Sequence, residues 1–577
     1  MRFALDAVAG LADVARLPGC AEATPELTAQ VLEEGGKFAA NVLAPLYRSG
    51  DMEGARLENG VVRTPRGWAE AYKAFVDGGW PGVPFDADHG GQGLPWTLAT
   101  PLAEMWNAAN LGWALCPMLT AGAAEALAAH GTPWQKATLL PRLVSGEWTG
   151  TMNLTEPQAG SDLGAIRCRA VPDGGAYRLT GQKIFITYGE HELTENIVHL
   201  VLARTPDAPM GVRGISLFAV PKYLVGADGR PGARNDLRCV RLESKLGIHA
   251  SPTCVMAYGE DGGALGTLVG EEGRGLECMF TMMNNERLAV GLQGVAVAER
   301  AYQLARAYAR ERRQGRDGAT GEAHVPIIRH ADVRRMLMTM RALTEAGRAL
   351  CYAVAAELDR AKRHPDEDAR KESLALVDFL TPVVKAWCTD TGVEVASTGI
   401  QVHGGMGFIE DTGAAQILRD ARITPIYEGT NGIQARDLVG RKLLREGGTT
   451  ARRLAALVSA SASHLTGELA PIGQGLARAV AAFDAATTAL LTAGARAPEE
   501  AAAVAVPYLD LVGVLAGGWV MARAAAADGV AASPAFRSAK RATARFYADA
   551  ILPRTEALAV IVRTGGASAL SLPEEAF

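Results

Sequence analysis

Apolar residues recur at helical spacing in the first and last parts of the chain and at strand spacing between them. Segment 24–26 (TPE) is typical of a helix start, with a capping hydroxyl, a proline and a first-turn acid. Helical spacing continues to Leu46, and a second apolar helical stretch covers 99–131, after a loop rich in glycine and proline at 78–95. The pattern predicts an N-terminal α-domain over residues 1–148.

The pattern then changes to strands. Apolar residues alternate with polar ones over 166–170, and a short apolar run follows at 197–203. Further strand-like pieces lie at 214–220 and 253–258, between glycine-rich loops. These segments predict a β-domain over residues 149–265.

Helical periodicity returns after the β-domain. Apolar residues from Leu288 to Tyr302 share one helical face, and those from Val333 to Leu350 share another, which predicts long bundle helices over 266–445. The remaining residues, 446–577, are alanine-rich and predict an additional helical domain with breaks near 472–474, 497–498 and 553. The predicted fold class is α+β and mainly α.

Charge and cysteine usage narrow the function. A net charge of −5 and the absence of a Lys/Arg-rich run give no cationic field for nucleic acid or anionic lipid. The eight cysteines lie far apart, without the spacing of metal ligands, so we expect reduced structural thiols and no metal site. Because the N-terminal segment also lacks the pattern of a secretion signal, we expect a cytoplasmic protein.

One stretch, 501–522, resembles a membrane span in composition. It contains Pro507 and Asp510, and its uninterrupted apolar part is much shorter than the ~20 residues that cross a bilayer. We therefore expect a buried helix there and no transmembrane segment.

The best candidate for chemistry is Glu428, in segment 426–434 (IYEGTNGIQ). It lies on a glycine-rich turn that opens a helix, where backbone N–H groups and the positive helix end favour an ionised carboxylate, as a base requires. The same features also describe an ordinary acidic residue at a helix start.

This string resembles the catalytic-glutamate motif of the acyl-CoA dehydrogenase family, and three further segments match that family in the expected order. They are 155–162 (TEPQAGSD), similar to the flavin signature, 183–187 (KIFIT), similar to the flavin-stacking strand, and 401–407 (QVHGGMG), similar to the adenine-side loop. The resemblance covers about 30–445 and implies the family's fold, with a central β-barrel-like domain between two helical ones. The additional domain resembles that of the longer bacterial members, which include 3-methylthiopropanoyl-CoA dehydrogenases.

The resemblance implies an FAD-dependent oxidoreductase of fatty acid metabolism that converts an acyl-CoA thioester to the trans-2-enoyl-CoA. Glu428 would remove the α-proton while the β-hydrogen leaves as hydride to flavin N5, because no protein side chain accepts hydride. An electron-transfer flavoprotein would be the electron acceptor. The C-terminal extension favours a homodimer, since in the family it covers a surface used for tetramer packing.

The resemblance also assigns binding residues. Those expected along the flavin ring and ribityl chain are Met152, Leu154, Thr155, Ser161, Phe185 and Thr187. Those expected at the FAD of a neighbouring subunit are Arg312, Gln401, Gly404 and Gly405, and the catalytic turn would add Thr430 and Gly432. Those expected to contact the acyl-CoA are Ser161, Arg287 and Gly429. Phe185 stands where many relatives have tryptophan, and Arg313 is an alternative to Arg312.

Several alternatives stay open at this point. Glu286 is a rival base, because a minority of the family takes its base from the position before the matching arginine, here Arg287. An acyl-CoA oxidase would use similar residues with oxygen as acceptor, and a non-dehydrogenating relative would bind DNA. The motifs do not determine the acyl group. His249 and His403 are interpreted as structural.

Overall fold

A computed structural model describes residues 1–226, 228–530 and 532–577. The described chain divides into two compact units. The helical unit comprises residues 1–32, 95–104 and 287–577, and the β-containing unit comprises 33–94 and 105–286. The chain therefore enters each unit more than once, and the predicted division into four consecutive domains stays a prediction.

The β-containing unit is built on a sheet that has eight strands within the described residues. These strands are β3 (Thr149–Asn153), β4 (Arg169–Asp173), β5 (Ala176–Thr187), β6 (Ile197–Arg204), β7 (Ile215–Pro221), β10 (Leu237–Leu242), β11 (Thr253–Tyr258) and β12 (Ala264–Val269). Strands β5, β12, β7 and β6 pair in that order, and β4 pairs with both β5 and β6. The path closes on itself, which confirms the barrel-like architecture. Strand β12 runs past the predicted boundary at residue 265.

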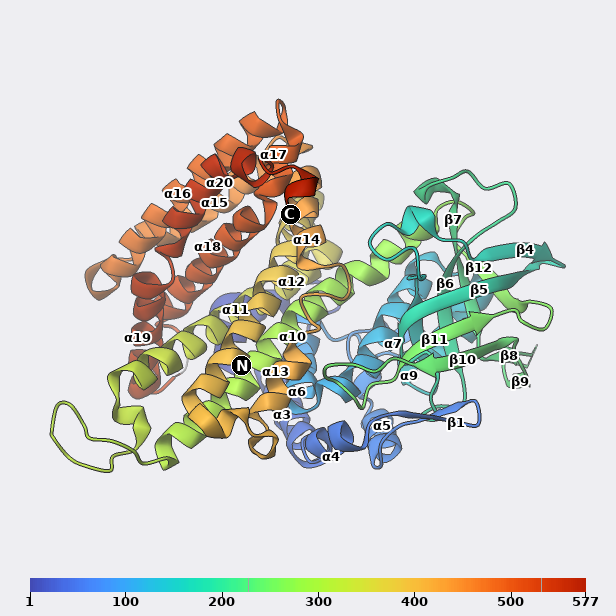
Figure 1. The fold of residues 1–577 in the computed structure, drawn as a ribbon, viewed down its shortest axis with the longest axis horizontal. Coiled ribbons are helices and arrows are strands. Elements are labelled where there is room, and N and C mark those ends of the chain that lie inside the picture. The colour runs from blue at the N-terminus through green and yellow to red at the C-terminus, as the bar shows by residue number, and fades with distance from the viewer. Residues whose placement is uncertain (227, 531) are drawn as a thin grey trace. The chain divides into compact units, whose positions relative to one another are not determined.

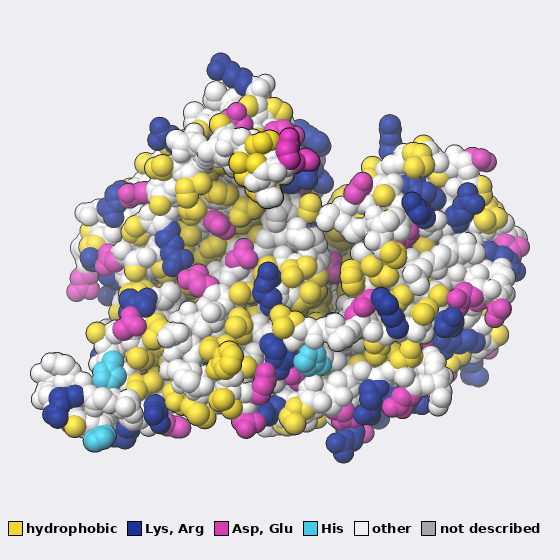
Figure 2. All heavy atoms as spheres, viewed as in Figure 1, with side chains coloured by type: hydrophobic (Ala, Val, Ile, Leu, Met, Phe, Trp, Pro, Cys, Tyr) yellow, Lys and Arg dark blue, Asp and Glu magenta, His cyan; other side chains and the backbone are white. Residues whose placement is uncertain are grey.

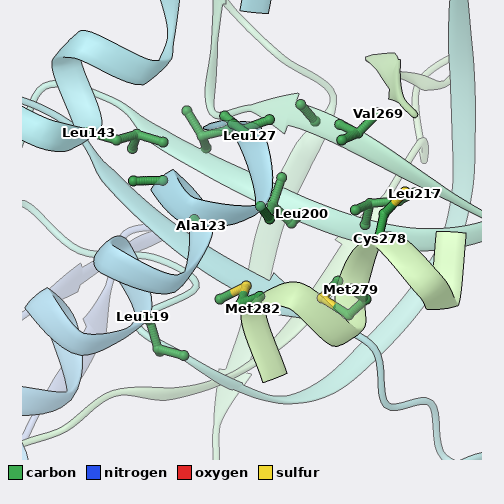
Figure 3. Packing of buried hydrophobic residues seen from close by; sticks show 14 of the residues in the cluster. Leu119, Ala123, Leu127, Leu143, Leu200, Leu217, Val269, Cys278, Met279 and Met282 are labelled. Atoms are coloured by element: carbon green, nitrogen blue, oxygen red, sulfur yellow. The ribbon is translucent and has the colours of Figure 1, made fainter. Parts of the chain in front are cut away.

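Helix α7 (Leu111–His130) covers this sheet at β3. Figure 3 shows Leu119, Ala123 and Leu127 of α7 in one cluster with Leu200 of β6 and with Met279 and Met282 of α10 (Gly275–Glu311). These side chains are at most 3% exposed and belong to one cluster. Asn110 starts α7 by accepting a hydrogen bond from the Trp113 N–H, so the helical stretch expected over 99–131 is divided there.

The helices at the N-terminal side agree with the apolar spacing. They are α3 (Pro25–Phe38), α4 (Leu46–Glu53), α5 (Trp68–Asp77) and α6 (Trp96–Ala109). The predicted start at 24–26 is confirmed, since α3 begins at Pro25 and the Thr24 hydroxyl accepts from the Leu27 N–H. The loop expected over 78–95 is also confirmed, with two short 3₁₀ turns in it.

The helical unit is organised around the long helices α10, α11 (Ala331–Arg363) and α12 (Glu367–His403). The predicted apolar face of α11 is buried, with Met340 and Leu350 both fully inaccessible to solvent. A buried ion cluster joins α6, α10 and α11: Arg348 of α11 lies 2.5 Å from Glu104 of α6 and 2.8 Å from Glu299 of α10. Burial would lower the pKa of Arg348, but these two carboxylates hold it above its ordinary value.

The C-terminal extension continues this helical unit. Its helices are α15 (Thr449–Ser463), α16 (Ala470–Gly494), α17 (Pro498–Ala503), α18 (Ala505–Ala526), α19 (Pro534–Ala550) and α20 (Arg554–Ala569). Figure 1 shows α15, α16, α18 and α20 alongside one another, and α18 packs on both α11 and α12. Gly513 and Gly517 of α18 leave room for the Trp387 ring of α12.

The break expected near 472–474 is wrong, whereas those at 497–498 and 553 are confirmed. Pro471 lies in the first turn of α16, where a helix loses no internal hydrogen bond to proline. Gly473 allows the end of α15 to approach, because a Cβ there would lie 2.7 Å from the Ala462 carbonyl oxygen. Both residues therefore belong to a continuous helix.

Three helical segments among the described residues are long and apolar enough to cross a membrane, by length and composition alone. They are α7, the segment Gly467–Gly494 and α18, so the expectation of one such stretch was too low. The most apolar windows of α7 and α18 are 78% and 83% buried inside the fold. Burial of this extent is typical of core helices.

Candidate functional site

Glu428 lies on the turn before α14 (Asn431–Asp437), as the sequence predicts. Thr430 caps this helix by accepting a hydrogen bond from the Ile433 N–H at 3.3 Å. Glu428 has a φ of 53° and Gly429 a φ of 85°, so two consecutive residues are left-handed. A non-glycine residue in this region costs about 1–2 kcal/mol, and such strain concentrates at functional sites.

Neighbouring side chains support this turn. The buried Gln434 amide donates to the carbonyl oxygens of Glu428 and Gly429 at 3.4 and 3.5 Å. A Cβ at Gly429 would lie 2.7 Å from the nitrogen of that amide, so the position suits only glycine. The Tyr427 hydroxyl donates to Gln293 of α10. The Glu428 side chain remains half-buried, which leaves it accessible to a reactant.

Glu286 differs from Glu428 in its surroundings. It lies within α10 but belongs to the β-containing unit, and it is 1% exposed. Its carboxylate faces the backbone of α7, since a Cβ at Gly122 would lie 2.9 Å from Glu286 Oε1. The neighbouring Arg287 is 7% exposed and belongs to the helical unit.

The segment 155–162 is fixed by a buried ion pair that the sequence analysis did not identify. Glu156 lies 2.8 Å from Lys183 of β5, with both side chains at most 3% exposed. The Glu156 carboxylate also accepts from the N–H groups of Arg167 and Cys168, and Lys183 donates to the Leu154 carbonyl at 2.9 Å. Burial would raise the pKa of Glu156, but Lys183 and the two N–H donors lower it to about 2. The two residues occur in separate motifs, and the spacing gave no sign of their contact.

The predicted flavin-side residues lie in or just before the segment 155–162 and at the end of β5. Met152 and Thr155 are half-buried, Leu154 is 8% exposed, and Ser161 is exposed. At the end of β5, Phe185 is 60% exposed with a φ of 61°, and Thr187 is half-buried.

This arrangement fits a flavin. A phenylalanine held exposed in a left-handed conformation is unusual in a soluble fold and provides a flat apolar face. Accessible hydroxyls of Thr155 and Ser161 supply polar contacts beside it. The donor set therefore suits a planar ring with a polar chain.

The residues expected at a neighbouring subunit's cofactor gather at the ends of α10 and α12. The Tyr308 ring of α10 lies 4.5 Å from the His403 ring of α12, which brings these helix ends together. Arg312 is one turn beyond Tyr308 and exposed, as are Gln401, Gly404 and Gly405 on the other helix end. A Cβ at Gly404 or Gly405 would meet no atom within 4 Å, so the backbone is open to a ligand.

The alternative residue Arg313 is engaged elsewhere. Its guanidinium donates to the His324 carbonyl at 2.7 Å and so holds the loop after α10. Within the described ranges, the Arg312 guanidinium makes one long contact, 3.5 Å, with the Gln314 side chain. The Arg312 guanidinium is therefore less engaged within the fold than that of Arg313.

Two further features were missed. Next to Gly404, the side chains of Met406, Phe408 and Ile409 are 47%, 84% and 47% exposed, and we call these three residues the apolar strip. His249 Nδ1 lies 3.0 Å from the Asp51 carboxylate, a partner distant in sequence that fixes the imidazole and agrees with a structural role.

Four protein-family models match the chain in order. "Acyl-CoA dehydrogenase, N-terminal domain" matches residues 26–147, and the middle-domain model of the same family matches 151–259. The corresponding C-terminal domain matches 273–444, and "Acetyl-CoA dehydrogenase C-terminal like" matches 449–573. The models cover both the region with recognised motifs and the extension.

Individual proteins agree with these matches. The chain is 55% identical over 531 residues, 90% of each protein, to the 3-methylmercaptopropionyl-CoA dehydrogenase of Ruegeria pomeroyi. It resembles in fold an acyl-CoA dehydrogenase from Bacillus anthracis solved with FAD (TM-score 0.76, 21% identity, covering 95% of this chain and 90% of that one). A third match is a structure described as the electron transferring flavoprotein of Acidaminococcus fermentans (TM-score 0.60, 27% identity, 73% and 99% coverage).

The Glu156–Lys183 pair makes a prediction about stability. Glu156→Gln leaves a buried ammonium group without its counter-charge, which costs about 3–5 kcal/mol of unfolding free energy. The folded carboxyl has a pKa near 2, below its ordinary 4.5, so its stabilisation is present above pH 4.5 and is lost as the pH falls toward 2. Thermal melts should therefore show a large deficit for the variant at pH 7 that narrows below pH 4.5.

Glu260→Gln is the matched control. Glu260 pairs with Arg238 at 2.6 Å, but both side chains are about half exposed, so its loss should change stability much less than loss of the buried pair. Equal deficits in the two variants would contradict a special role for the buried pair.

Proposed function

The chain belongs to the acyl-CoA dehydrogenase family and is an FAD-dependent oxidoreductase acting on a CH–CH bond, and on this premise we propose that it oxidises 3-methylthiopropanoyl-CoA, with Glu428 as the base. The observation that carries the substrate is the 55% identity, over 90% of each chain, to the 3-methylmercaptopropionyl-CoA dehydrogenase of Ruegeria pomeroyi. 3-Methylmercaptopropionyl-CoA is another name for the same thioester.

In the proposed mechanism, bound FAD supplies the hydride acceptor that no side chain can provide. Glu428 takes the proton from the α-carbon of the thioester. Backbone N–H groups of the turn beside Gly429 stabilise the enolate-like thioester oxygen, a role that suits fixed dipoles. The left-handed backbone at Glu428 and Gly429 holds the base in place before the substrate arrives.

We propose the following chain residues as ligands of the cofactor and the substrate. Those proposed along the flavin are Met152, Leu154, Thr155, Ser161, Phe185 and Thr187, with Thr430 and Gly432 from the catalytic turn. Those proposed to bind the FAD of a neighbouring subunit are Arg312, Gln401, Gly404 and Gly405. Ser161, Arg287 and Gly429 are proposed to contact the acyl-CoA. The planar donors of a guanidinium suit a pyrophosphate.

We favour Glu428 over Glu286 because of accessibility. Glu428 is half-buried on a turn, whereas the Glu286 carboxylate is 1% exposed and directed at α7. A base must reach the proton that it removes, so the more accessible carboxylate is the better candidate.

The proposed electron acceptor is an electron-transfer flavoprotein, and the proposed assembly is a cytoplasmic homodimer. The apolar strip supports the dimer, because exposed apolar clusters mark protein interfaces and this one adjoins the residues expected at a neighbour's FAD.

The chain's eight cysteines, all within the described ranges, are free and buried, as expected in a reducing compartment. Fractionation of the source cells should recover the protein with cytoplasmic markers, and recovery with membranes would contradict this location.

The other functional classes have less support. Figure 2 shows Lys and Arg side chains interspersed with Asp and Glu over the visible face, whereas DNA binding needs a concentrated cationic one. An oxidase would keep the same base and flavin, so it differs from the proposal only in the electron acceptor.

Glu428→Gln tests the base. The variant should keep bound yellow flavin, because the amide preserves the shape of the side chain, but lose most dehydrogenation, by about 10²-fold or more. Turnover and the flavin spectrum measure the two effects. Glu286→Gln is the matched variant and should retain most activity. Activity lost in Glu286→Gln and retained in Glu428→Gln would reverse the assignment.

A panel of thioesters tests the substrate. Anaerobic bleaching of the flavin should be most efficient with 3-methylthiopropanoyl-CoA, compared with butanoyl-, hexanoyl- and palmitoyl-CoA. The efficiency of bleaching should fall by about 10- to 200-fold for each methylene that the acyl chain has too many or too few. A methylene in an apolar pocket changes binding by ~1–3 kcal/mol. Reoxidation should be faster with electron-transfer flavoprotein than with oxygen. A clear preference for palmitoyl-CoA would reject the substrate, and rapid peroxide formation would identify an oxidase.

Sedimentation tests the dimer. The 60.6 kDa chain should sediment as a dimer with bound FAD, and Phe408→Asp should weaken both association and FAD retention, because it places a charge in the apolar strip. Met210→Asp, at a residue that is 85% exposed elsewhere, is the control and should change neither. A monomer with full FAD occupancy would contradict the shared site.

A further inference from the structure

Lys385 of α12 is fully buried, and it contacts the helix that follows the catalytic turn. Its Nζ donates to the side-chain oxygen of Asn431 at 2.9 Å. The Asn431 amide in turn donates to the Ala386 carbonyl at 3.2 Å and to the Thr389 hydroxyl at 3.1 Å. Asn431 is three residues after Glu428, so one face of α12 anchors the turn that carries the proposed base.

A buried lysine is costly unless nearby groups stabilise its charge. The groups around Lys385 show which charges do so. Burial lowers the pKa of Lys385 to about 7, while the charges of Glu428 and Asp390 oppose this shift and that of Arg287 adds to it. The Glu428 charge is therefore close enough to act on the ammonium group. Near neutral pH it changes between its charged and neutral forms.

The charged groups around Lys385 come from several elements. Glu428 faces it from the turn, Asp390 from its own helix and Arg287 from α10. Burial raises the pKa of Asp390, and the neighbouring Asn431, Lys385 and Arg422 oppose that shift. In the extension, partial burial and the charge of Asp390 raise the pKa of Asp510 on α18 to about 7.

We propose that Lys385 is a positioning residue for the reaction: it anchors the catalytic turn through Asn431, and its ammonium group favours the ionised carboxylate of Glu428. The inference rests on the proposed role of Glu428 as base. Below pH 7 the lysine carries its proton, so a cation is present at the pH values where the base must lose its own. Loss of this cation should make the base harder to ionise.

The test compares Lys385→Met with Lys371→Met in the FAD-loaded enzyme. Lys371 lies on the same helix, but its side chain is 65% exposed, so it serves as the matched control. Lys385→Met should lower kcat about tenfold, the loss expected for one charge-assisted hydrogen bond, with KM changed much less. The acid limb of the kcat profile should move upward by about half a pH unit to one unit. The control should match the wild type.

A second readout is independent of activity. The unfolded lysine keeps its proton up to about pH 10.5, whereas the folded one loses it near pH 7, so wild-type stability should rise with pH across this window. Thermal melts of Lys385→Met should lack this rise, and those of Lys371→Met should keep it. A lysine with an ordinary titration would give parallel curves for all three proteins and would overturn the inference.

Asn431→Ser keeps the inference testable if Lys385→Met does not fold. It should reduce kcat to a similar extent, and the double variant should lose little more, because both residues act through one contact. Independent, fully additive losses would contradict the anchor. The outcomes also separate the two proposals: an active Glu428→Gln rejects the base itself. An inactive Glu428→Gln with a wild-type pH profile in Lys385→Met rejects only the role of the lysine.

Discussion

The catalytic turn depends on a backbone conformation that its sequence does not prefer. Glu428 and Gly429 are both left-handed, and only the second can adopt this region without strain. The surrounding residues offset the cost: Thr430 caps α14, Gln434 donates to the two strained carbonyls, and Asn431 is bound to α12. A backbone turn held by these contacts has little conformational freedom left to lose when substrate binds, which is the advantage of a preorganised site.

The β-containing unit shows a similar combination of strain and support. Phe185 is left-handed and exposed at the end of β5, two residues after Lys183, whose ammonium group is buried against Glu156. The ion pair joins β5 to the segment 155–162, which contains Glu156, and Lys183 also donates to the carbonyl of Leu154 just before that segment. A buried pair of this kind contributes less to net stability than to a defined geometry, since desolvation consumes much of its attraction. Because Lys183 precedes the exposed Phe185 by two residues on β5, the pair helps to define the backbone that presents this ring.

Local patterns predicted the elements well, because capping residues and apolar spacing act over a few residues. Segment 24–26 starts α3, the apolar face of α11 is buried, and Glu428 precedes a helix capped by Thr430. What failed depended on tertiary context. From sequence alone Gly473 predicts a helix break. In the structure it lies inside α16, where the absence of a side chain lets the end of α15 approach. The Glu156–Lys183 and Lys385–Asn431 contacts join residues 27 and 46 positions apart, for which one sequence contains no periodic signal.

The same reasoning changes the interpretation of the C-terminal extension. By sequence it is an alanine-rich addition without chemical motifs, yet α18 packs on α12 through Gly513 and Gly517, which accommodate the Trp387 ring. Trp387 is two residues after Lys385, and Asp510 of α18 lies near Asp390 on that helix. The extension therefore buries the side of α12 that carries Trp387. It also places the carboxyl group of Asp510 near Asp390 of the same helix. Because protein interiors are close-packed, removal of α18 would expose Trp387 and loosen the part of α12 that contains Lys385. The extension therefore helps to stabilise the catalytic turn.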